Sequence, residues 1–206
     1  MKVDLAATKT NLLKTKKSLA LTEEGFDLLD EKRRILMSEL TAVIDSVDQH
    51  QRDVDSSLKQ AYDLLDKVVV RTGRMRLEEL SLAIDVKTTL DISQRRVMGV
   101  SVPVIELYVK ENPPYYSSYD VNIYVDEAIQ RFKSVLKSLA LLAEKKITLL
   151  RLAEEAQKTI RKVNALEKIY LPYYRQTLKS ISDRLDEESR EAFSMLKLIK
   201  KEKMRQ

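Results

Sequence analysis

The sequence predicts a mainly α-helical protein in which the N- and C-terminal segments form a long antiparallel two-helix coiled coil. A small middle lobe with a short β-hairpin and a short helix is expected between them. Charged residues make up 33% of the chain, with only 3 glycines and 4 prolines, a composition typical of long helices. Apolar residues recur at heptad spacing in both terminal segments, which indicates coiled-coil helices.

The first helix is expected over residues 1–70. Its heptad track comprises Leu5, Leu12, Leu19, Phe26, Arg33, Leu40, Val47, Val54, Ala61 and Val68. Only Arg33 interrupts this apolar track. Gly25 lies inside the pattern and costs about 1 kcal/mol relative to alanine. It is interpreted either as a tolerated weak point or as a place where another backbone approaches closely.

The middle lobe is expected over residues 71–121. Gly73, within a cluster of arginines, ends the first helix, and residues 77–83 are expected to form a short helix. The β-branched stretch 97–109 predicts a strand, with residues 84–88 as its candidate partner. Pro103 cannot donate to a strand ladder, so we expect it at an edge or a bulge.

The second helix is expected over residues 122–206. One heptad track comprises Ile129, Leu136, Ala143, Leu150, Gln157, Asn164, Leu171, Leu178, Leu185, Ala192 and Ile199. A second track runs from Phe132 to Met195 and includes Glu167. Buried polar residues in such a seam can fix the register of a coiled coil. Pro172 is expected to bend the helix rather than stop it, because the tracks continue beyond it.

Neither long helix can bury its apolar stripe alone, so we expect them to fold back on each other. An aspartate at Leu150 or Leu178 should then disrupt the pair. Residues 1–21 hold five lysines and one aspartate, a charge of +4, and residues 195–206 hold five cations and one glutamate, also +4. Both chain ends would lie at one end of the pair and form a basic tip.

The composition gives little support to catalysis. The chain has no cysteine and one histidine, His50, so cysteine-ligated metals are excluded and a reducing cytosolic setting is the simplest interpretation. No glycine-rich phosphate loop is present. No run of ~18 apolar residues occurs, so we expect no membrane insertion. We therefore expect a non-catalytic protein without a cofactor or metal.

Five tyrosines gather near the predicted loop, namely Tyr108, Tyr115, Tyr116, Tyr119 and Tyr124. With Arg95 and Arg96 they suggest either a base-stacking surface or a lobe core with a protein interface. The mixed local charge favours the protein interface over nucleic acid.

Several motifs together resemble the D subunit of the V-type and A-type rotary ATPases. In the C-terminal half they are Arg161-Lys-Val-Asn-Ala-Leu-Glu167, Leu171-Pro172, Thr177-Leu-Lys-Ser-Ile181 and Phe193-Ser-Met-Leu-Lys-Leu-Ile-Lys200. In the N-terminal half they are Thr8-Lys9, Lys16-Lys17, Gly25-Phe-Asp-Leu-Leu29 and Lys32-Arg33. The middle contributes Val100-Ser-Val-Pro103. The chain departs from the family pattern at Ala7, where proline is usual, and at Asp30, where lysine is common.

The resemblance implies a cytoplasmic, membrane-peripheral protein of the central stalk, that is, a rotor shaft. It would transmit torque between the ATP-hydrolysing or ATP-synthesising hexamer and the membrane ring that translocates ions. The implied partners are the catalytic A and B subunits, the small F subunit of the central stalk and the funnel subunit that links to the ring. A coiled-coil adaptor or membrane-surface tether with a basic tip is the alternative class, and a nucleic-acid binder is a third possibility.

The resemblance also implies three groups of site residues. The interface with the hexamer bore would comprise Lys9, Lys16, Lys17, Lys197 and Lys200. The shaft motif and register residues would be Gly25, Lys32, Arg33, Gln157, Asn164, Ala165, Leu166, Glu167 and Pro172. The interface with the small F subunit would comprise Val100, Val102, Pro103 and Tyr108.

Overall fold

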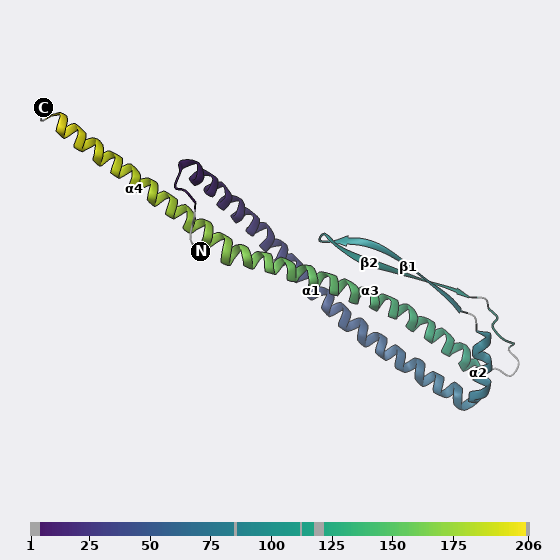
Figure 1. The fold of residues 1–206 in the computed structure, drawn as a ribbon. Helices are drawn as coiled ribbons and strands as arrows, with labels where there is room; N and C mark the ends of the chain where they lie inside the picture. The colour runs from purple at the N-terminus through teal and green to yellow at the C-terminus, as the bar shows by residue number, and fades with distance from the viewer. Residues whose placement is uncertain (1–4, 85, 112, 118–121, 205–206) are drawn as a thin grey trace. The chain divides into compact units, whose positions relative to one another are not determined.

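The structure, a computed structural model, describes residues 5–84, 86–111, 113–117 and 122–204. Its elements are α1 (Lys9–Thr72), α2 (Arg74–Ala83), β1 (Val86–Val97), β2 (Val100–Glu111), α3 (Ile123–Ala165), a π-helical turn η1 (Leu166–Tyr170) and α4 (Leu171–Lys203) (Figure 1). Two long helical segments thus flank a short helix and a β-hairpin. This confirms the predicted fold class.

The chain folds as two compact units. One comprises Met1–Ile35 together with Ala156–Gln206, and the other is Leu36–Glu155. The helices α1 and α3 each contribute residues to both units.

The heptad track predicted for the first helix is confirmed in the second half of α1, where its members Val47, Val54, Ala61 and Val68 are all buried. Its earlier members within α1 are half-buried. The helix begins after Thr8, whose hydroxyl accepts a hydrogen bond from the Asn11 N–H at 3.2 Å. A threonine at this position satisfies one of the free N–H groups of the first helical turn.

In the unit Leu36–Glu155, α1 packs against α3 in antiparallel orientation. Val47 and Val54 share a core cluster with Leu142, whereas Val68 lies with Val125 and Ala128. The residue numbers of the contacts therefore increase along α1 while they decrease along α3, as in an antiparallel pair. Figure 1 shows these two segments side by side.

In the other unit, the first half of α1 packs against α4, again antiparallel. Lys9, Leu12 and Leu13 line a shallow hollow together with Ser182, Leu185, Asp186 and Ser189. Further along α1, Glu23 forms an ion pair with Arg175 at 2.9 Å. The N- and C-terminal segments therefore pair in antiparallel orientation within each unit, as predicted.

Gly73 separates α1 from α2. Its φ of 83° lies in the left-handed region, which glycine adopts without steric cost. The short helix begins at Arg74, three residues before the predicted start, and ends at Ala83 as expected.

The β-hairpin is longer than predicted. Residues 86–88 belong to the partner strand, as expected, and pair with residues 109–111. The ladder then continues to Val97↔Val100. Met98 and Gly99 form the turn, both with positive φ, which matches the twist of a two-residue hairpin. The expected strand over 97–109 was therefore wrong at its start, because a two-residue turn hides inside an apolar run. Nearly all residues of β1 are exposed. Because neither face of this strand is buried, its sequence lacks the apolar alternation that would have predicted the full strand.

Pro103 lies on the outer edge of β2, as predicted. The Ile105 N–H points away from β1 and donates to Glu144 of α3 at 2.9 Å. The Ser101 carbonyl likewise points away from β1 and accepts from Arg151 at 2.7 Å. The backbone N–H and C=O groups of successive strand residues point to opposite edges of the strand, so those of residues 101, 103 and 105 all point away from β1. Pro103 therefore removes no hydrogen bond of the β1–β2 ladder.

The heptad tracks predicted for the second helix are wrong by one residue before Pro172. The buried positions are Ala128, Val135, Leu142, Ala156 and Val163, each one residue before the predicted member. From Leu171 onward the predicted positions Leu171 and Ile181 are buried, and Thr177, one residue before the predicted Leu178, is buried as well.

The π-helical turn η1 explains this shift. The Leu171 N–H donates to the carbonyl of Leu166, five residues earlier, whereas an α-helix uses a spacing of four. The turn therefore holds one extra residue, and the seam changes phase across it. The helix continues through Pro172, as expected, with the π turn placed directly before the proline.

Leu150 is consequently not a seam residue. It is 64% exposed, whereas Leu152 is fully buried. The expectation that a charge at Leu150 would disrupt the helix pair was wrong for this reason. Leu178 is half-buried beside the buried Thr177.

Candidate interaction surfaces

The last part of α4 is largely uncovered by the rest of the described chain, although Asp186 and Ser189 still line the hollow against α1. The described side chains from Asp186 to Met204 are all exposed. They include several large apolar residues, namely Phe193, Met195, Leu196, Leu198, Ile199 and Met204. Exposed apolar side chains gathered along one stretch indicate a contact surface for another protein. We call residues 186–204 the α4 end.

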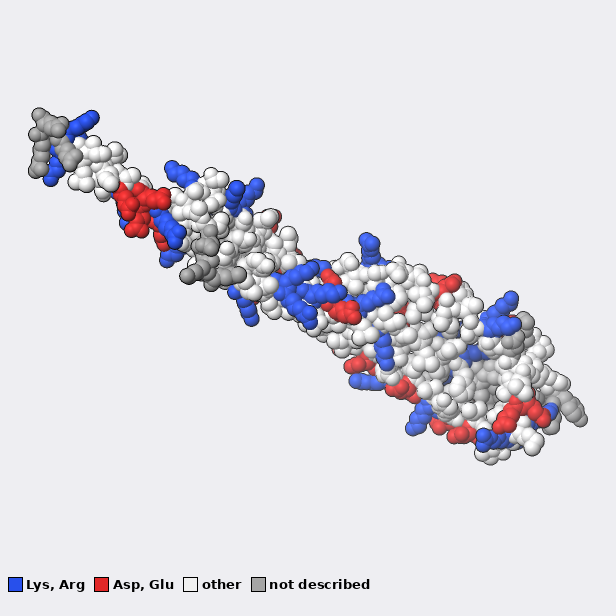
Figure 2. All heavy atoms as spheres, in the orientation of Figure 1, with Lys and Arg blue, Asp and Glu red and all other residues white. Residues whose placement is uncertain are grey.

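Charge along the α4 end is largely segregated. Acidic residues predominate first, at Asp186, Glu187, Glu188 and Glu191, with Arg190 among them. Lys197, Lys200, Lys201 and Lys203 follow, with Glu202 among them. Figure 2 shows the acidic and basic side chains on this part of the helix. The Lys197 ammonium lies 4.6 Å from the centre of the Phe193 ring, within range of a cation–π contact.

The five lysines expected at the hexamer bore are all exposed, but they form two groups. Lys9 lines a hollow with residues 182–189 of α4, and Lys16 and Lys17 follow along α1. Lys200 lies eleven residues beyond Ser189, about 16 Å further along the helix. Among the described residues, the two basic segments therefore do not merge into one basic tip, which corrects that expectation.

The N-terminal motif residues lie on α1. A Cβ on Gly25 would meet no atom within 4 Å, so no other backbone approaches it closely within the described chain. Arg33 is half-buried on the heptad track, and its guanidinium pairs with Asp30 at 2.6 Å. Asp30 also pairs with Arg34 at 2.9 Å. The aspartate that departs from the family pattern thus neutralises the arginine that interrupts the seam. Lys32 is half-buried.

The C-terminal motif surrounds the π turn. Asn164, Ala165 and Leu166 are half-buried, whereas Gln157, Glu167 and Pro172 are exposed. The seam beside them is formed by Ala156, Thr159 and Val163 instead. Ile169 and Tyr170 of the π turn are also exposed, by 55% and 49%. The motif therefore presents much of its surface outward.

The hairpin residues expected at a protein interface differ in exposure. Val102 and Pro103 are buried within the chain, Val100 is half-buried and Tyr108 is 52% exposed. The Tyr108 hydroxyl donates to Glu106 at 2.5 Å. This hydrogen bond, followed by the carboxylate's charge, raises the pKa of Tyr108. Of the four residues, Tyr108 offers the most surface to a partner.

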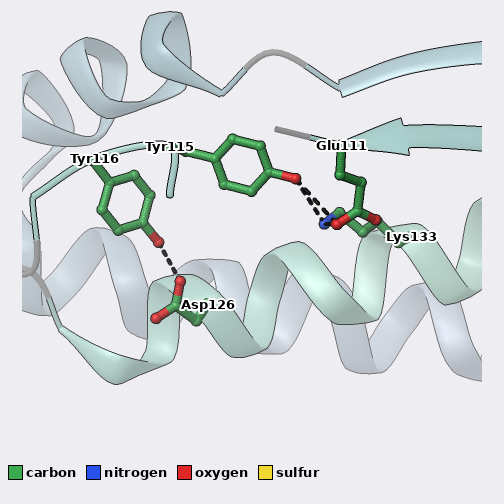
Figure 3. A network of polar contacts seen from close by, with 5 residues as sticks. All are labelled: Glu111, Tyr115, Tyr116, Asp126 and Lys133. Carbon is green, nitrogen blue, oxygen red and sulfur yellow. Dashed lines mark hydrogen bonds and ion pairs between the residues drawn. The ribbon is translucent and has the colours of Figure 1, made fainter. Parts of the chain in front are cut away.

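Two tyrosines anchor the loop after β2 to α3 (Figure 3). The Tyr116 hydroxyl donates to Asp126 at 2.5 Å, and burial together with this hydrogen bond raises the pKa of Tyr116. Lys133 is buried on α3, where it pairs with Glu111 at 2.7 Å and donates to the Tyr115 hydroxyl at 3.2 Å. Burial alone would lower the pKa of Lys133, but the hydrogen bonds to Glu111 and Tyr115 raise it.

This network was missed by the sequence reasoning, although the tyrosine cluster was the signal for it. Tyr124 contributes elsewhere, with the Arg71 guanidinium 4.5 Å from its ring centre. Tyr119 lies outside the described residues. The described loop tyrosines mostly serve contacts within the chain, as expected for a lobe core.

An apolar groove lies between α1, α2, the base of β1 and α3. It has a volume of about 660 Å³, and its lining includes Leu77, Val86, Val125 and Phe132. Within the described residues, no group of three or more histidine, cysteine, aspartate or glutamate side chains gathers as a metal site. None of the described helices is long and apolar enough to cross a bilayer.

Long paired helices, an uncovered helix end and an exposed hairpin define a helical protein built for contacts with other proteins. Comparison with known proteins makes this specific. The family model of the ATP synthase D subunit matches residues 11–201. The chain therefore belongs to the family of ATP synthase D subunits.

Individual relatives agree over nearly the whole chain. The A-type ATP synthase D subunit of Pyrococcus abyssi is 36% identical over 94% of this chain and 92% of its own length. The V-type ATP synthase D subunit of Thermotoga neapolitana is 35% identical over 96% of this chain and 98% of its own length. The A-type D subunit of Methanobrevibacter smithii is 37% identical over 94% of this chain and 85% of its own length.

Proposed function

We propose that this chain belongs to the central stalk of an A-type or V-type rotary ATPase. In this role it is a non-catalytic rotor shaft that transmits torque between the hexamer that hydrolyses or synthesises ATP and the membrane ring that translocates ions. Family membership over residues 11–201 supports the assignment. The structural observation that carries it is the α4 end, whose apolar and basic side chains have no cover within the described chain.

The packing suits a part that carries torque. A single helix twists and bends easily in solvent, whereas two helices with interlocked seams resist this. Seam residues such as Val54, Leu142 and Leu152 are buried by 95% or more, so helix–helix slippage would expose apolar surface.

We assign surfaces of the chain to the hexamer subunits and to the small F subunit. The catalytic A and B subunits would surround the α4 end and the exposed lysines Lys9, Lys16, Lys17, Lys197 and Lys200. The small F subunit would bind the hairpin side that carries Tyr108. The funnel subunit would join the chain to the membrane ring, which places the chain in the cytoplasm at the membrane periphery without insertion.

Charge reversal on the α4 end tests this proposal. The chain is co-expressed with the nucleotide-binding subunits, and the assembled complex is quantified by native mass spectrometry. Lys197→Glu with Lys200→Glu is expected to reduce assembly strongly, because both cations lie on the uncovered surface. Lys179→Glu is the matched control, an exposed lysine on the same helix, and should assemble normally.

Failure of the unmodified chain to join the hexamer would contradict the proposal. The adaptor or tether alternative predicts membrane binding by the isolated chain instead of assembly with the hexamer. In that case the isolated chain floats with anionic liposomes, and reversal of Lys200 and Lys201 abolishes flotation.

A further inference from the structure

Three charged side chains of α3 contact β2 at three points along its length. Lys133 pairs with the Glu111 carboxylate at 2.7 Å, near the end of the strand. Glu144 accepts the Ile105 N–H at 2.9 Å, and Arg151 donates to the Ser101 carbonyl at 2.7 Å. We call Lys133, Glu144 and Arg151 the latch residues.

The latch residues share one face of α3. They are separated by eleven and seven residues, which correspond to about three and two full helical turns. Their contacts on β2 occur in the reverse order, at 111, 105 and 101, so β2 runs antiparallel to α3. Four strand residues span about 13 Å, and seven helical residues span about 10.5 Å. Long side chains such as Glu144 and Arg151 accommodate this small mismatch.

Two of the three contacts are made to backbone groups on the outer edge of β2. The N–H of Ile105 and the carbonyl of Ser101 both point away from β1. In a larger sheet these groups would pair with a third strand. Here side chains of α3 take the place of that strand.

Apolar packing alone would leave the hairpin free to slide. Val102 is 1% exposed and Pro103 is also buried, so burial favours contact of the hairpin with the rest of the unit. The hydrophobic effect is non-directional, however, and depends mainly on area. Hydrogen bonds depend on distance and angle, so the polar contacts select one position among those that bury similar area.

We infer that Lys133, Glu144 and Arg151 form a latch that fixes the hairpin in one register on α3, and that opening the latch frees the hairpin as an intact two-stranded unit. The β1–β2 ladder spans twelve residue pairs, and the latch contributes none of its bonds. Loss of the latch therefore loosens the attachment of the hairpin without separating its strands.

Amide hydrogen exchange measured by NMR on the full chain tests the latch. In Glu144→Ala with Arg151→Ala, exchange at the Ile105 amide is expected to accelerate about tenfold or more, the equivalent of one lost hydrogen bond. The inward-pointing amides of the β1–β2 ladder should keep their protection. The matched control is Glu154→Ala with Arg131→Ala, which removes an exposed glutamate and an exposed arginine from the same helix.

The spatial consequence is measured with a pair of spin labels. The chain has no cysteine, so Met98→Cys and Leu139→Cys place labels only at the hairpin turn and on α3, both at exposed positions. The distance distribution between them should be narrow in the parent and broadened or shifted in the double alanine variant. Unchanged Ile105 exchange together with an unchanged distance distribution would overturn the latch.

A conservative pair keeps the test decisive if the double variant fails to fold. Glu144→Gln retains a carbonyl oxygen that can accept the Ile105 N–H, whereas Glu144→Ala retains no acceptor. The latch predicts slow Ile105 exchange in the glutamine variant and fast exchange in the alanine variant. Equal exchange in the two would contradict it.

Discussion

Leu150 and Leu152 stand two residues apart on α3 in different environments. The first is 64% exposed and the second is fully buried. Both are leucines in a helical heptad pattern, so local composition does not separate them. The two side chains point to different faces of α3, because successive residues of an α-helix are rotated by about 100° around its axis.

Truncation of these two leucines should therefore have unequal effects. Leu152→Ala is expected to lower the free energy of unfolding by about 2–5 kcal/mol, because it removes buried methyl groups and leaves a cavity. Leu150→Ala should change it by less than about 0.5 kcal/mol. Urea denaturation followed by circular dichroism measures both. Similar losses in the two variants would contradict the assigned seam.

The ion pair between Glu111 and Lys133 predicts a pH dependence. The hydrogen bond from Lys133 holds the pKa of Glu111 below its ordinary value of 4.5. A lowered carboxyl pKa contributes stability that is present above the unfolded pKa and is lost as pH falls through the folded one. Glu111→Gln should thus be less stable than the parent at neutral pH, and the difference should vanish in acid.

Thermal unfolding at a series of pH values checks this sign. The measurement follows the midpoints of the parent and of Glu111→Gln from about pH 7 down to about pH 3, on either side of the ordinary carboxyl pKa. A difference between the two proteins that stays constant across this range would show that the carboxylate charge contributes nothing.

At the scale of elements, the π turn determines how α3 and α4 share one seam. The buried residues Val163 and Leu171 are eight positions apart, whereas an α-helical heptad places equivalent residues seven apart. The turn from Leu166 to Tyr170 accommodates the extra residue. It lies directly before Pro172, whose missing N–H would leave a carbonyl unsatisfied in a regular α-helix.

Single-residue deletions distinguish this turn from the helix around it. Deleting the exposed Lys168 removes the extra residue and keeps the seam in phase, so the thermal midpoint should fall only slightly. Deleting the exposed Lys179 from the regular turns of α4 rotates Ile181, which is 1% exposed, off the seam by about 100°. The thermal midpoint of this variant should then fall markedly. Equal falls of the midpoint in the two deletion variants would contradict the assignment of one extra residue to the π turn.

The sequence predicted those elements whose pattern is uninterrupted. The α1 track from Val47 to Val68 was correct because no insertion disturbs its period. A one-residue π insertion is invisible in a heptad count, so the tracks before Pro172 were displaced. The strand β1 was underestimated because only positions such as Leu90 and Ile92 are apolar and both are exposed. Motifs suggested the family, but contacts such as Glu144 to Ile105 depend on tertiary structure.

At the scale of the whole molecule, the candidate interaction surfaces are divided between the two units. The α4 end lies in the unit that contains both chain termini, whereas the hairpin and the apolar groove lie in the unit Leu36–Glu155. Family membership links this division to an ATP synthase. The central claim is that the chain rotates within that complex and carries torque.

A rotation assay tests this claim most directly. The chain has no cysteine, so Met75→Cys, at a 78% exposed position on α2, gives one attachment point for a bead on a surface-fixed hexamer. We predict unidirectional, ATP-dependent rotation of the bead, abolished when the α4 end is truncated. ATP hydrolysis with a bead that stays fixed or moves without direction would contradict the account.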